Sequence, residues 1–366
     1  MHTIHCIGHR AGIYQPACTD CGDCCGGCNV GAKNTVAVTY LPFAANHGCE
    51  MFTEARVSHI EKSPAGEWIV VVDDVTGGKP TGAVRRLSAD KVIVAAGTLG
   101  STEILLRTRD KGLALSDRLG RRFSANGDII AFGYGAGVPV NSVGIGYPAK
   151  IDRHVVGAAV SGQLEIIDAD DLARSMIIQE GAMPSAMAPM LPVMFLPNGR
   201  LLGALQSLIT GVYQGPFQHL QMFFAVSHDS ASGVFTLDGD RLDLAWPGAK
   251  DEAVYRRLDE ALGKVVGAVG GSYVKNPLAG TVMGHQPATA HPLGGASMGA
   301  DRSTGVVDHK GRAFDPRGGE TTVHDGLYVV DGSIIPRSLG CNPLLTITAL
   351  AERAMIHMGR DVGLVM

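Results

Sequence analysis

The chain has 366 residues, a formal net charge of −4, 45% hydrophobic residues and 49 glycines. This length suits two or three domains with a sizeable core, and the mild acidity without a basic stripe argues against a nucleic-acid partner. No uninterrupted apolar run is long enough to cross a bilayer, and the opening residues MHTIHCIGHR lack the apolar segment of a secretory signal. We therefore expect a cytoplasmic protein that is either soluble or peripherally attached to a membrane.

The first 35 residues are irregular and rich in glycine and cysteine. Their cysteines follow the spacing C-x2-C-x2-C-x3-C, with which ferredoxins hold an iron–sulfur cluster, and zinc also suits four thiolates. A compact loop without a metal is the alternative. The crowding of cysteines is unlike the even spread of a secreted disulfide framework, so a reducing compartment is expected. The candidate metal ligands are Cys18, Cys21, Cys24 and Cys28.

Hydrophobic spacing predicts a helix over 35–47 and a strand at 68–72. Residues 91–96 (KVIVAA) are predicted to form a short buried strand that ends at Gly97, and 98–107 are predicted to form a helix. A strand, a glycine turn and a helix in this order make one βα unit of a nucleotide-binding sheet.

The middle of the chain is rich in glycine, and its stretch from 181 to 228 carries almost no charge. Short apolar strands between 123 and 167 predict an antiparallel sheet, and 251–269 has the pattern of an amphipathic helix. From 181 to 228 the only formal charge is Arg200, and methionines interleave with prolines. This stretch is either an apolar tunnel or lid that contacts a membrane, or ordinary core packing, because methionine serves both purposes.

Two patterns toward the C-terminus are candidates for chemistry. Residues 327–330 (LYVV) predict a buried strand, and Asn342 followed by Pro343 is a good start for a helix that runs to about Met355. The free N–H groups and positive dipole end of such a helix favour a nearby anion. His291 precedes Pro–Leu–Gly–Gly, where glycines allow a ligand to approach the backbone, and an imidazole suits general-base work. Taken alone, the helix and the histidine each have a purely structural explanation.

Several motifs, in this order, resemble the glucose–methanol–choline (GMC) family of FAD-dependent oxidoreductases, and in particular its cholesterol-oxidase-like branch. GAKNT resembles the family's lysine-containing flavin loop, and VIVAAGTLGS its second FAD-contact segment. FSANGD resembles the family's transition to the substrate domain, and HPLGG and CNPLLTITALAER resemble its catalytic pair. The histidine and asparagine motifs are specific as a pair, and together they favour function over the structural explanations.

The resemblance implies roles for individual residues. His291 is expected to be the active-site base, and Asn342 to be its partner across the site, bonded to the substrate oxygen or to the flavin. The implied reaction oxidises a CH–OH group of a hydrophobic, sterol-like alcohol by hydride transfer to flavin N5, with oxygen or another electron acceptor, in steroid or lipid metabolism. The residues expected to bind FAD are Val57, Ala96, Gly97, Gly100, Ser101, Asn126, Asp331, Gly332, Asn342, Pro343 and Leu344.

The implied fold is α/β, with a discontinuous, Rossmann-like FAD-binding portion and an α+β substrate domain that contains an antiparallel sheet. The family's GxGxxG segment wraps the FAD diphosphate and is not found in the first 35 residues. We therefore expect an incomplete FAD-binding portion and weak or no FAD binding by this chain alone. The expected domains are a Cys/Gly-rich segment at 1–35, a first FAD-binding part at 36–122, a substrate-binding domain at 123–285 and a C-terminal FAD-binding part with the catalytic pair at 286–366.

Two alternative functions stay open. One is a flavin alcohol dehydrogenase that passes electrons through an iron–sulfur centre at the four cysteines of the N-terminal run. The other is a non-catalytic, truncated fragment or partner subunit.

Overall fold

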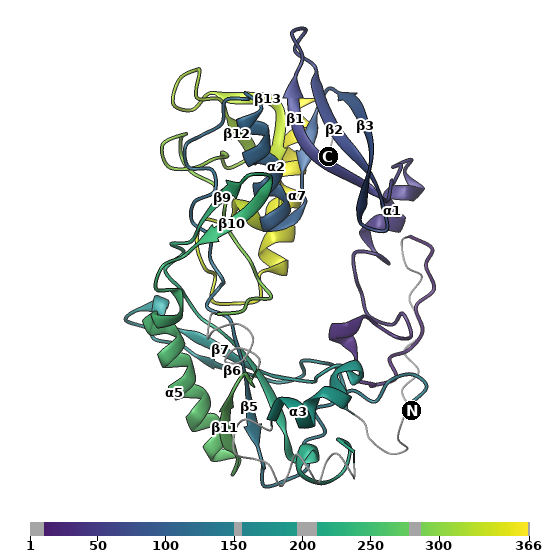
Figure 1. Ribbon diagram of the computed structural model, residues 1–366, viewed down its shortest axis with the longest axis vertical. Coiled ribbons are helices and arrows are strands. Elements are labelled where there is room, and N and C mark those ends of the chain that lie inside the picture. The colour runs from purple at the N-terminus through teal and green to yellow at the C-terminus, as the bar shows by residue number, and fades with distance from the viewer. Residues whose placement is uncertain (1–10, 150–155, 196–210, 278–286, 365–366) are drawn as a thin grey trace.

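The computed structural model describes residues 11–149, 156–195, 211–277 and 287–364, and Figure 1 shows two parts stacked along its long axis. The upper part contains α1 (Tyr40–Asn46), β1 (Ala55–Lys62), β2 (Trp68–Thr76), β3 (Lys79–Ala89), β4 (Val92–Val94), α2 (Gly97–Asp110), β9 (Val234–Asp238), β10 (Arg241–Ala245), β12 (Arg312–Phe314), β13 (Val323–Val329) and α7 (Leu344–Asp361). The lower part contains β5 (Ile129–Tyr134), β6 (Gln163–Ile166), β7 (Met176–Gly181), α3 (Leu191–Phe195), β8 (Gln221–Val226), α5 (Ala253–Ala268) and β11 (Ser272–Lys275).

A small mixed sheet organises the upper part. β4 runs parallel to β13, and β12 pairs antiparallel with the other side of β13. α2 begins at Gly97, whose φ of +77° lets the chain turn sharply after β4. The predicted strand–glycine–helix step is therefore confirmed, and with it the α/β character of this part.

β4 lies at one edge of this sheet within the described residues. Apolar side chains are exposed near it: Ile93 in the strand is 42% exposed, and Leu99 in the first turn of α2 is 50% exposed. Parallel strands are usually covered on both faces and paired on both edges. This side of the upper part is therefore open, in contrast to the side that faces β13.

The three-stranded antiparallel sheet β1–β2–β3 is fastened to β13 by Trp68. Trp68 is 1% exposed, and its Nε1 donates a 2.9 Å hydrogen bond to the carbonyl oxygen of Asp325. Val57, expected near the adenine, lies in β1 opposite Val72 of β2 and packs against the main core.

The main core joins segments that are far apart in the sequence. Leu105 and Leu106 of α2 pack with Val94 of β4, Val329 of β13 and Leu293 of the HPLGG loop. The hairpin β9–β10 adds Phe235 to the same core, although it belongs to the middle of the chain.

The lower part is a five-stranded antiparallel sheet in the order β11–β5–β8–β7–β6, which confirms the predicted antiparallel sheet. α5 covers one face with Leu258, Leu262 and Val266, all of which are fully buried. The amphipathic helix predicted at 251–269 is confirmed, and the structure places it at Ala253–Ala268.

The other face of this sheet packs against the methionine- and proline-rich stretch. Met183, Met194 and Phe195 are buried in a second core, whereas Met190 and Val193 are more than half exposed. The described residues of this stretch thus pack mostly as core. Arg200 lies outside the described residues.

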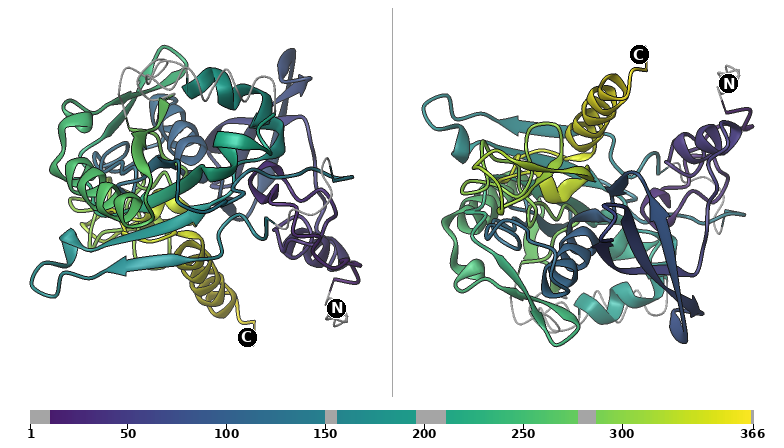
Figure 2. Two further views of the ribbon diagram at one scale, coloured as in Figure 1. Left: turned by 90° about the horizontal axis from the view of Figure 1, so that it is seen from below. Right: turned by 90° about the horizontal axis from the view of Figure 1, so that it is seen from above.

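Helix boundaries differ from their predictions at α1, α2 and α7, and α2 runs to Asp110 rather than to 107. The first helix begins at Tyr40 rather than near 35, which places Pro42 in the first turn, where a missing N–H breaks no helical hydrogen bond. α7 continues past Met355 to Asp361, because Met358 still packs against the core beneath the helix. Figure 2 shows the C-terminal end of α7 projecting from the body in both views. Within the described residues, no helix combines the length and apolarity needed to cross a membrane.

Candidate active site

His291 and Asp128 form the centre of the candidate site. Nδ1 of His291 lies 3.1 Å from Oδ1 of Asp128, and the Asp128 side chain is fully buried while 17% of the His291 side chain is exposed. Oδ2 of Asp128 accepts hydrogen bonds from Thr289 Oγ1 (2.8 Å) and from the backbone N–H of Ala290 (2.9 Å). Because an ionised carboxylate can only accept hydrogen bonds, the donor to Asp128 is the Nδ1–H group of His291. A neutral His291 therefore carries its proton on Nδ1, and Nε2 is the nitrogen that can accept a proton.

Asn126 connects this pair to the loop before α7. Its side chain is fully buried, donates to the carbonyl oxygen of Cys341 (2.9 Å) and accepts from the N–H groups of Leu339 (2.8 Å) and Gly340 (3.2 Å). Asn342 follows this loop directly and is exposed at the start of α7. Two side chains of one short segment, Asn126 and Asp128, therefore position both the histidine loop and the loop that leads to Asn342.

His228 lies against the same loop. A Cβ atom on Gly340 would stand 2.4 Å from Nε2 of His228, so only glycine fits beside this imidazole. Burial lowers the pKa of His228 below its ordinary value, which favours the neutral ring at pH 7.

Asp229 holds the FSANGD segment, residues 123–128, in place through hydrogen bonds. Its carboxylate accepts from Ser124 Oγ (2.8 Å) and from the N–H groups of Gly127 and Ala231 (both 3.0 Å). Burial raises the pKa of Asp229 above its ordinary value.

Sequence reasoning assigned no role to Asp128, His228 or Asp229. The available signals were weak: an acidic residue that ends FSANGD, and a His–Asp pair directly after an apolar strand.

Asp331 joins the end of β13 to the start of α2. Its Oδ2 accepts from the N–H of Gly97 (2.9 Å) and from Ser101 Oγ, and its Oδ1 accepts from the N–H (2.9 Å) and Oγ (2.6 Å) of Ser333. Both oxygens are therefore engaged by the protein. Asp331 and the fully buried Ser101 hold α2 in place.

Three candidate segments meet at Gly332. A Cβ atom there would stand 2.9 Å from Thr98 Oγ1, 3.2 Å from the Pro292 carbonyl oxygen and 3.3 Å from Ile347 Cδ1. Thr98 Oγ1 also donates a 2.7 Å hydrogen bond to that carbonyl oxygen. The first turns of α2 and α7 thus adjoin the residue after His291, so the candidate base lies beside several of the expected FAD-binding positions.

This junction fits a flavin. No side chain caps the N-terminus of α7, and Leu344 and Leu345 in its first turn are 71% and 81% exposed. No heavy atom lies within 4 Å of where a Cβ atom on Gly97 would stand, so there is open space beside the start of α2. Free N–H groups and a positive dipole end favour anionic groups. Gly97 and the first turn of α7 are the residues that would hold FAD. At the neighbouring positions, a Cβ atom on Gly100 would contact Ala96 Cβ at 3.0 Å, so these two residues pack on each other.

Asp23 connects the segment that contains the four candidate cysteines, residues 18–28, to the lower part. This carboxylate is 3% exposed and accepts from the N–H groups of Gly146 and Ser185. Lys33 of the GAKNT motif donates from Nζ to the carbonyl oxygen of Cys24 (3.2 Å) and lies within this segment.

The structure does not support the candidate metal site at these cysteines. Within the described ranges, no group of three or more His, Cys, Asp or Glu side chains is arranged to hold a metal ion. Cys21 is buried, Cys18 is exposed and contacts Asp20, and the Sγ of Cys28 accepts from the N–H of Lys33. In the described residues, the thiols of Cys18, Cys21, Cys24 and Cys28 therefore do not converge on a common point.

Comparison with known proteins adds three findings. Family models described as GMC oxidoreductase match residues 13–125 and 266–351. A cholesterol oxidase of Mycobacterium tuberculosis is 28% identical over 94% of this chain and 59% of its own length, and a long-chain-alcohol oxidase of Arabidopsis thaliana is 24% identical over 90% of this chain and 45% of its own. A solved FAD-dependent oxidoreductase from Chaetomium thermophilum has a TM-score of 0.58 at 15% identity, over 92% of this chain and 65% of that one, which shows a shared fold. The chain spans about three fifths of the length of the cholesterol oxidase relative.

Proposed function

Because this chain belongs to the GMC oxidoreductase family, we propose that it takes part in the FAD-dependent oxidation of a CH–OH group of a hydrophobic alcohol. The observation that carries this proposal is the His291–Asp128 pair, in a loop that adjoins the first turns of α2 and α7. A base beside the segments expected to hold the flavin is the arrangement that this reaction requires.

In the proposed reaction, Nε2 of His291 accepts the proton of the substrate hydroxyl group, and the buried carboxylate of Asp128 stabilises the imidazolium ion that forms. When bound, FAD supplies the acceptor for the hydride that leaves the carbinol carbon. The side-chain amide of Asn342 donates a hydrogen bond to the substrate oxygen. Uncapped N–H groups at the start of α7 stabilise negative charge nearby.

The substrate class is proposed from the relatives. One acts, by its name, on cholesterol and the other on long-chain alcohols, so a sterol or a similarly apolar alcohol is the substrate we propose here, with oxygen as the electron acceptor. Met190 and Val193 are exposed apolar side chains on the lower part. We include peripheral membrane contact through these residues in the proposal, and co-sedimentation of the chain with phospholipid vesicles tests it.

The direct test measures hydrogen peroxide and flavin reduction by the purified chain with added FAD. Cholesterol and a long-chain primary alcohol are compared with a reaction that lacks alcohol. We expect alcohol-dependent reduction that falls at least about 100-fold in His291→Gln, whereas His47→Gln, at an exposed histidine, keeps the wild-type rate. Reduction of a dye without peroxide would identify a dehydrogenase. A folded wild-type chain that binds FAD but reduces it with neither alcohol would overturn the proposal and favour the non-catalytic alternative.

A further inference from the structure

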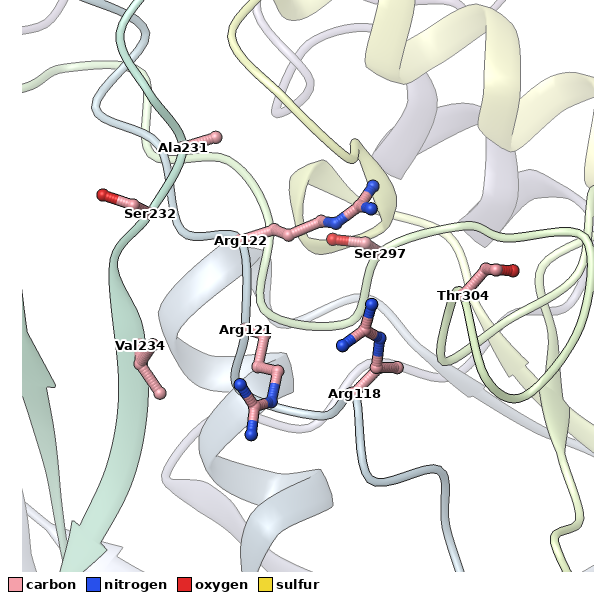
Figure 3. Close-up of a pocket in the computed structure, with 8 residues that line it drawn as sticks. All are labelled: Arg118, Arg121, Arg122, Ala231, Ser232, Val234, Ser297 and Thr304. Carbon is pink, nitrogen blue, oxygen red and sulfur yellow. The ribbon is translucent and has the colours of Figure 1, made fainter.

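A second site lies outside the residues expected to bind FAD. It is a pocket of about 210 Å³ between the loop that follows α2, the start of β9 and the loop that follows HPLGG. Its polar lining is shown in Figure 3 and consists of Arg118, Arg121, Arg122, Ser232, Ser297 and Thr304. The pocket therefore combines three cationic groups with three hydroxyl groups.

The arginines have no acidic partner in the part of the chain that the structure describes. No ion pair involves Arg118, Arg121 or Arg122, and Arg121 Nε makes only a 3.4 Å contact with the carbonyl oxygen of Asp117. Two acidic groups are connected to the lining through its hydroxyl groups. Asp301 Oδ1 accepts a 3.1 Å hydrogen bond from Thr304 Oγ1, and Glu252 is reached from Ser232 through the hydroxyl group of Ser230. Neither carboxylate forms an ion pair with the three arginines among the described residues. Cationic groups held close together repel one another unless an anion lies between them.

Ser297 provides an independent sign of a ligand. Its side chain is 2% exposed, and its Oγ is buried with no hydrogen-bond partner among the described residues. Figure 3 shows the guanidinium groups of Arg118 and Arg122 on either side of this hydroxyl group, while Arg121 turns away. A buried hydroxyl group without a partner is unfavourable, and an anion bound between the two arginines would accept its hydrogen bond.

The backbone around the pocket is fixed by the HPLGG loop. Gly120 donates to the carbonyl oxygen of Gly295 (2.7 Å), and Gly295 donates to that of Arg121 (3.1 Å). A Cβ atom on Gly294 would stand 1.9 Å from the carbonyl oxygen of Arg122, so the two segments are in direct contact. The arginine loop is therefore preorganised by its contact with the loop that carries His291.

We infer that this pocket binds a phosphate group, with Arg118 and Arg122 as its charged ligands and Ser297 as a hydrogen-bond donor. Guanidinium groups match phosphate oxygens in geometry and charge. The phosphate is either free inorganic phosphate or the phosphate of a small organic ester, and the pocket volume accommodates both.

The test titrates the purified full chain, without added flavin, with inorganic phosphate and with glycerol phosphate by calorimetry, at constant ionic strength set with chloride. We expect saturable binding that weakens about tenfold in Arg118→Gln, in Arg122→Gln and in Ser297→Ala, because each variant removes one hydrogen bond to a charged group. Tighter binding of the ester than of phosphate identifies an organic phosphate as the ligand. Equal binding identifies free phosphate.

Arg241→Gln is the matched control, since Arg241 is exposed on β10 and its loss changes the net charge equally. If Arg241→Gln weakens binding as much as the pocket variants do, the phosphate is attracted by the overall charge of the protein, and the proposed site is wrong. Unchanged affinity in Ser297→Ala also overturns the site. Should a glutamine variant fail to fold, Arg122→Lys retains the charge without the planar guanidinium group, and wild-type affinity in that variant contradicts the arginine–phosphate geometry.

Discussion

The carboxylate of Asp128 and the imidazole of His291 lie 3.1 Å apart, although they are 163 positions apart in the chain. The carboxylate is completely buried and bonded to two further donors, so it is held rigidly in place. Replacement by asparagine keeps the shape but removes the charge that stabilises a protonated His291. We expect Asp128→Asn to lower the alcohol-dependent rate about 100-fold in initial-rate measurements with added FAD. Asp110→Asn, at an exposed carboxylate, is the control, and an Asp128→Asn rate within about twofold of wild type would contradict the proposed role.

Asn126 is predicted to stabilise the fold, because its side chain holds the loop before α7 in place. Asn126→Ala removes acceptors for two backbone N–H groups, which costs about 2–4 kcal/mol of the free energy of unfolding. Because Asn126 has a φ of +57°, alanine also introduces backbone strain of about 1 kcal/mol, and Asn126→Gly avoids that strain. Urea denaturation of both variants separates the two effects. Loss of less than about 0.5 kcal/mol in either variant would mean that this side chain does not hold the loop.

The opening beside Gly97 can be tested without measuring turnover. Gly97→Ala and Gly48→Ala both place alanine at a positive φ with open space around the new methyl group. Both variants should therefore lose about 1–2 kcal/mol of stability. If FAD occupies the space at the start of α2, only Gly97→Ala should weaken FAD binding, by about tenfold or more. Flavin fluorescence titration measures this, and equal FAD affinities of the two variants would place the flavin elsewhere.

His324 should make stability depend on pH. Its side chain is fully buried, and burial lowers its pKa below the ordinary value near 6.5. Above pH 6.5 the ring is neutral in both the folded and the unfolded chain. Below pH 6.5 the unfolded chain takes up a proton that the folded chain binds less readily, so stability is lost as pH falls, by up to about 1.4 kcal/mol per pH unit. Urea denaturation between pH 7 and 5 should show a shallower slope for His324→Gln, and equal slopes would contradict the buried neutral ring.

The sequence predicted those features that depend on local signals. The step from strand to α2 followed from a short apolar run and a glycine. The presence of α7 followed from the Asn342–Pro343 signal, but the expected N-cap was wrong, because the helix begins at Leu344 with Pro343 as its N-cap and no side-chain cap. Family resemblance supplied His291 and Asn342 as the catalytic pair. Whether these two side chains act on one substrate remains part of the proposed function.

Long-range partners could not be predicted from the sequence. Nothing in the pattern around Asp128 indicates that a histidine 163 positions later packs against it. Asp331 stays a predicted FAD contact, but its hydrogen bonds to Gly97, Ser101 and Ser333 could not be predicted from its neighbours in the sequence. The ferredoxin spacing left a metal site open, but the four thiols form no metal-binding group in the described residues. Asp23 instead connects the same segment to Gly146 and Ser185 of the lower part, a contact that the spacing does not indicate. Spacing specifies which residues are near in sequence, whereas a metal site requires them to converge in space.

The open edge of β4 has a practical consequence for solution experiments. A strand with unpaired backbone groups and exposed apolar side chains can pair with another polypeptide, including a second copy of the same chain. Rates and affinities should therefore be recorded at several dilutions, so that behaviour of single molecules is separated from behaviour of associated ones. Ile93→Lys places a charge on that edge, so this variant should associate less and can be used for the same measurements.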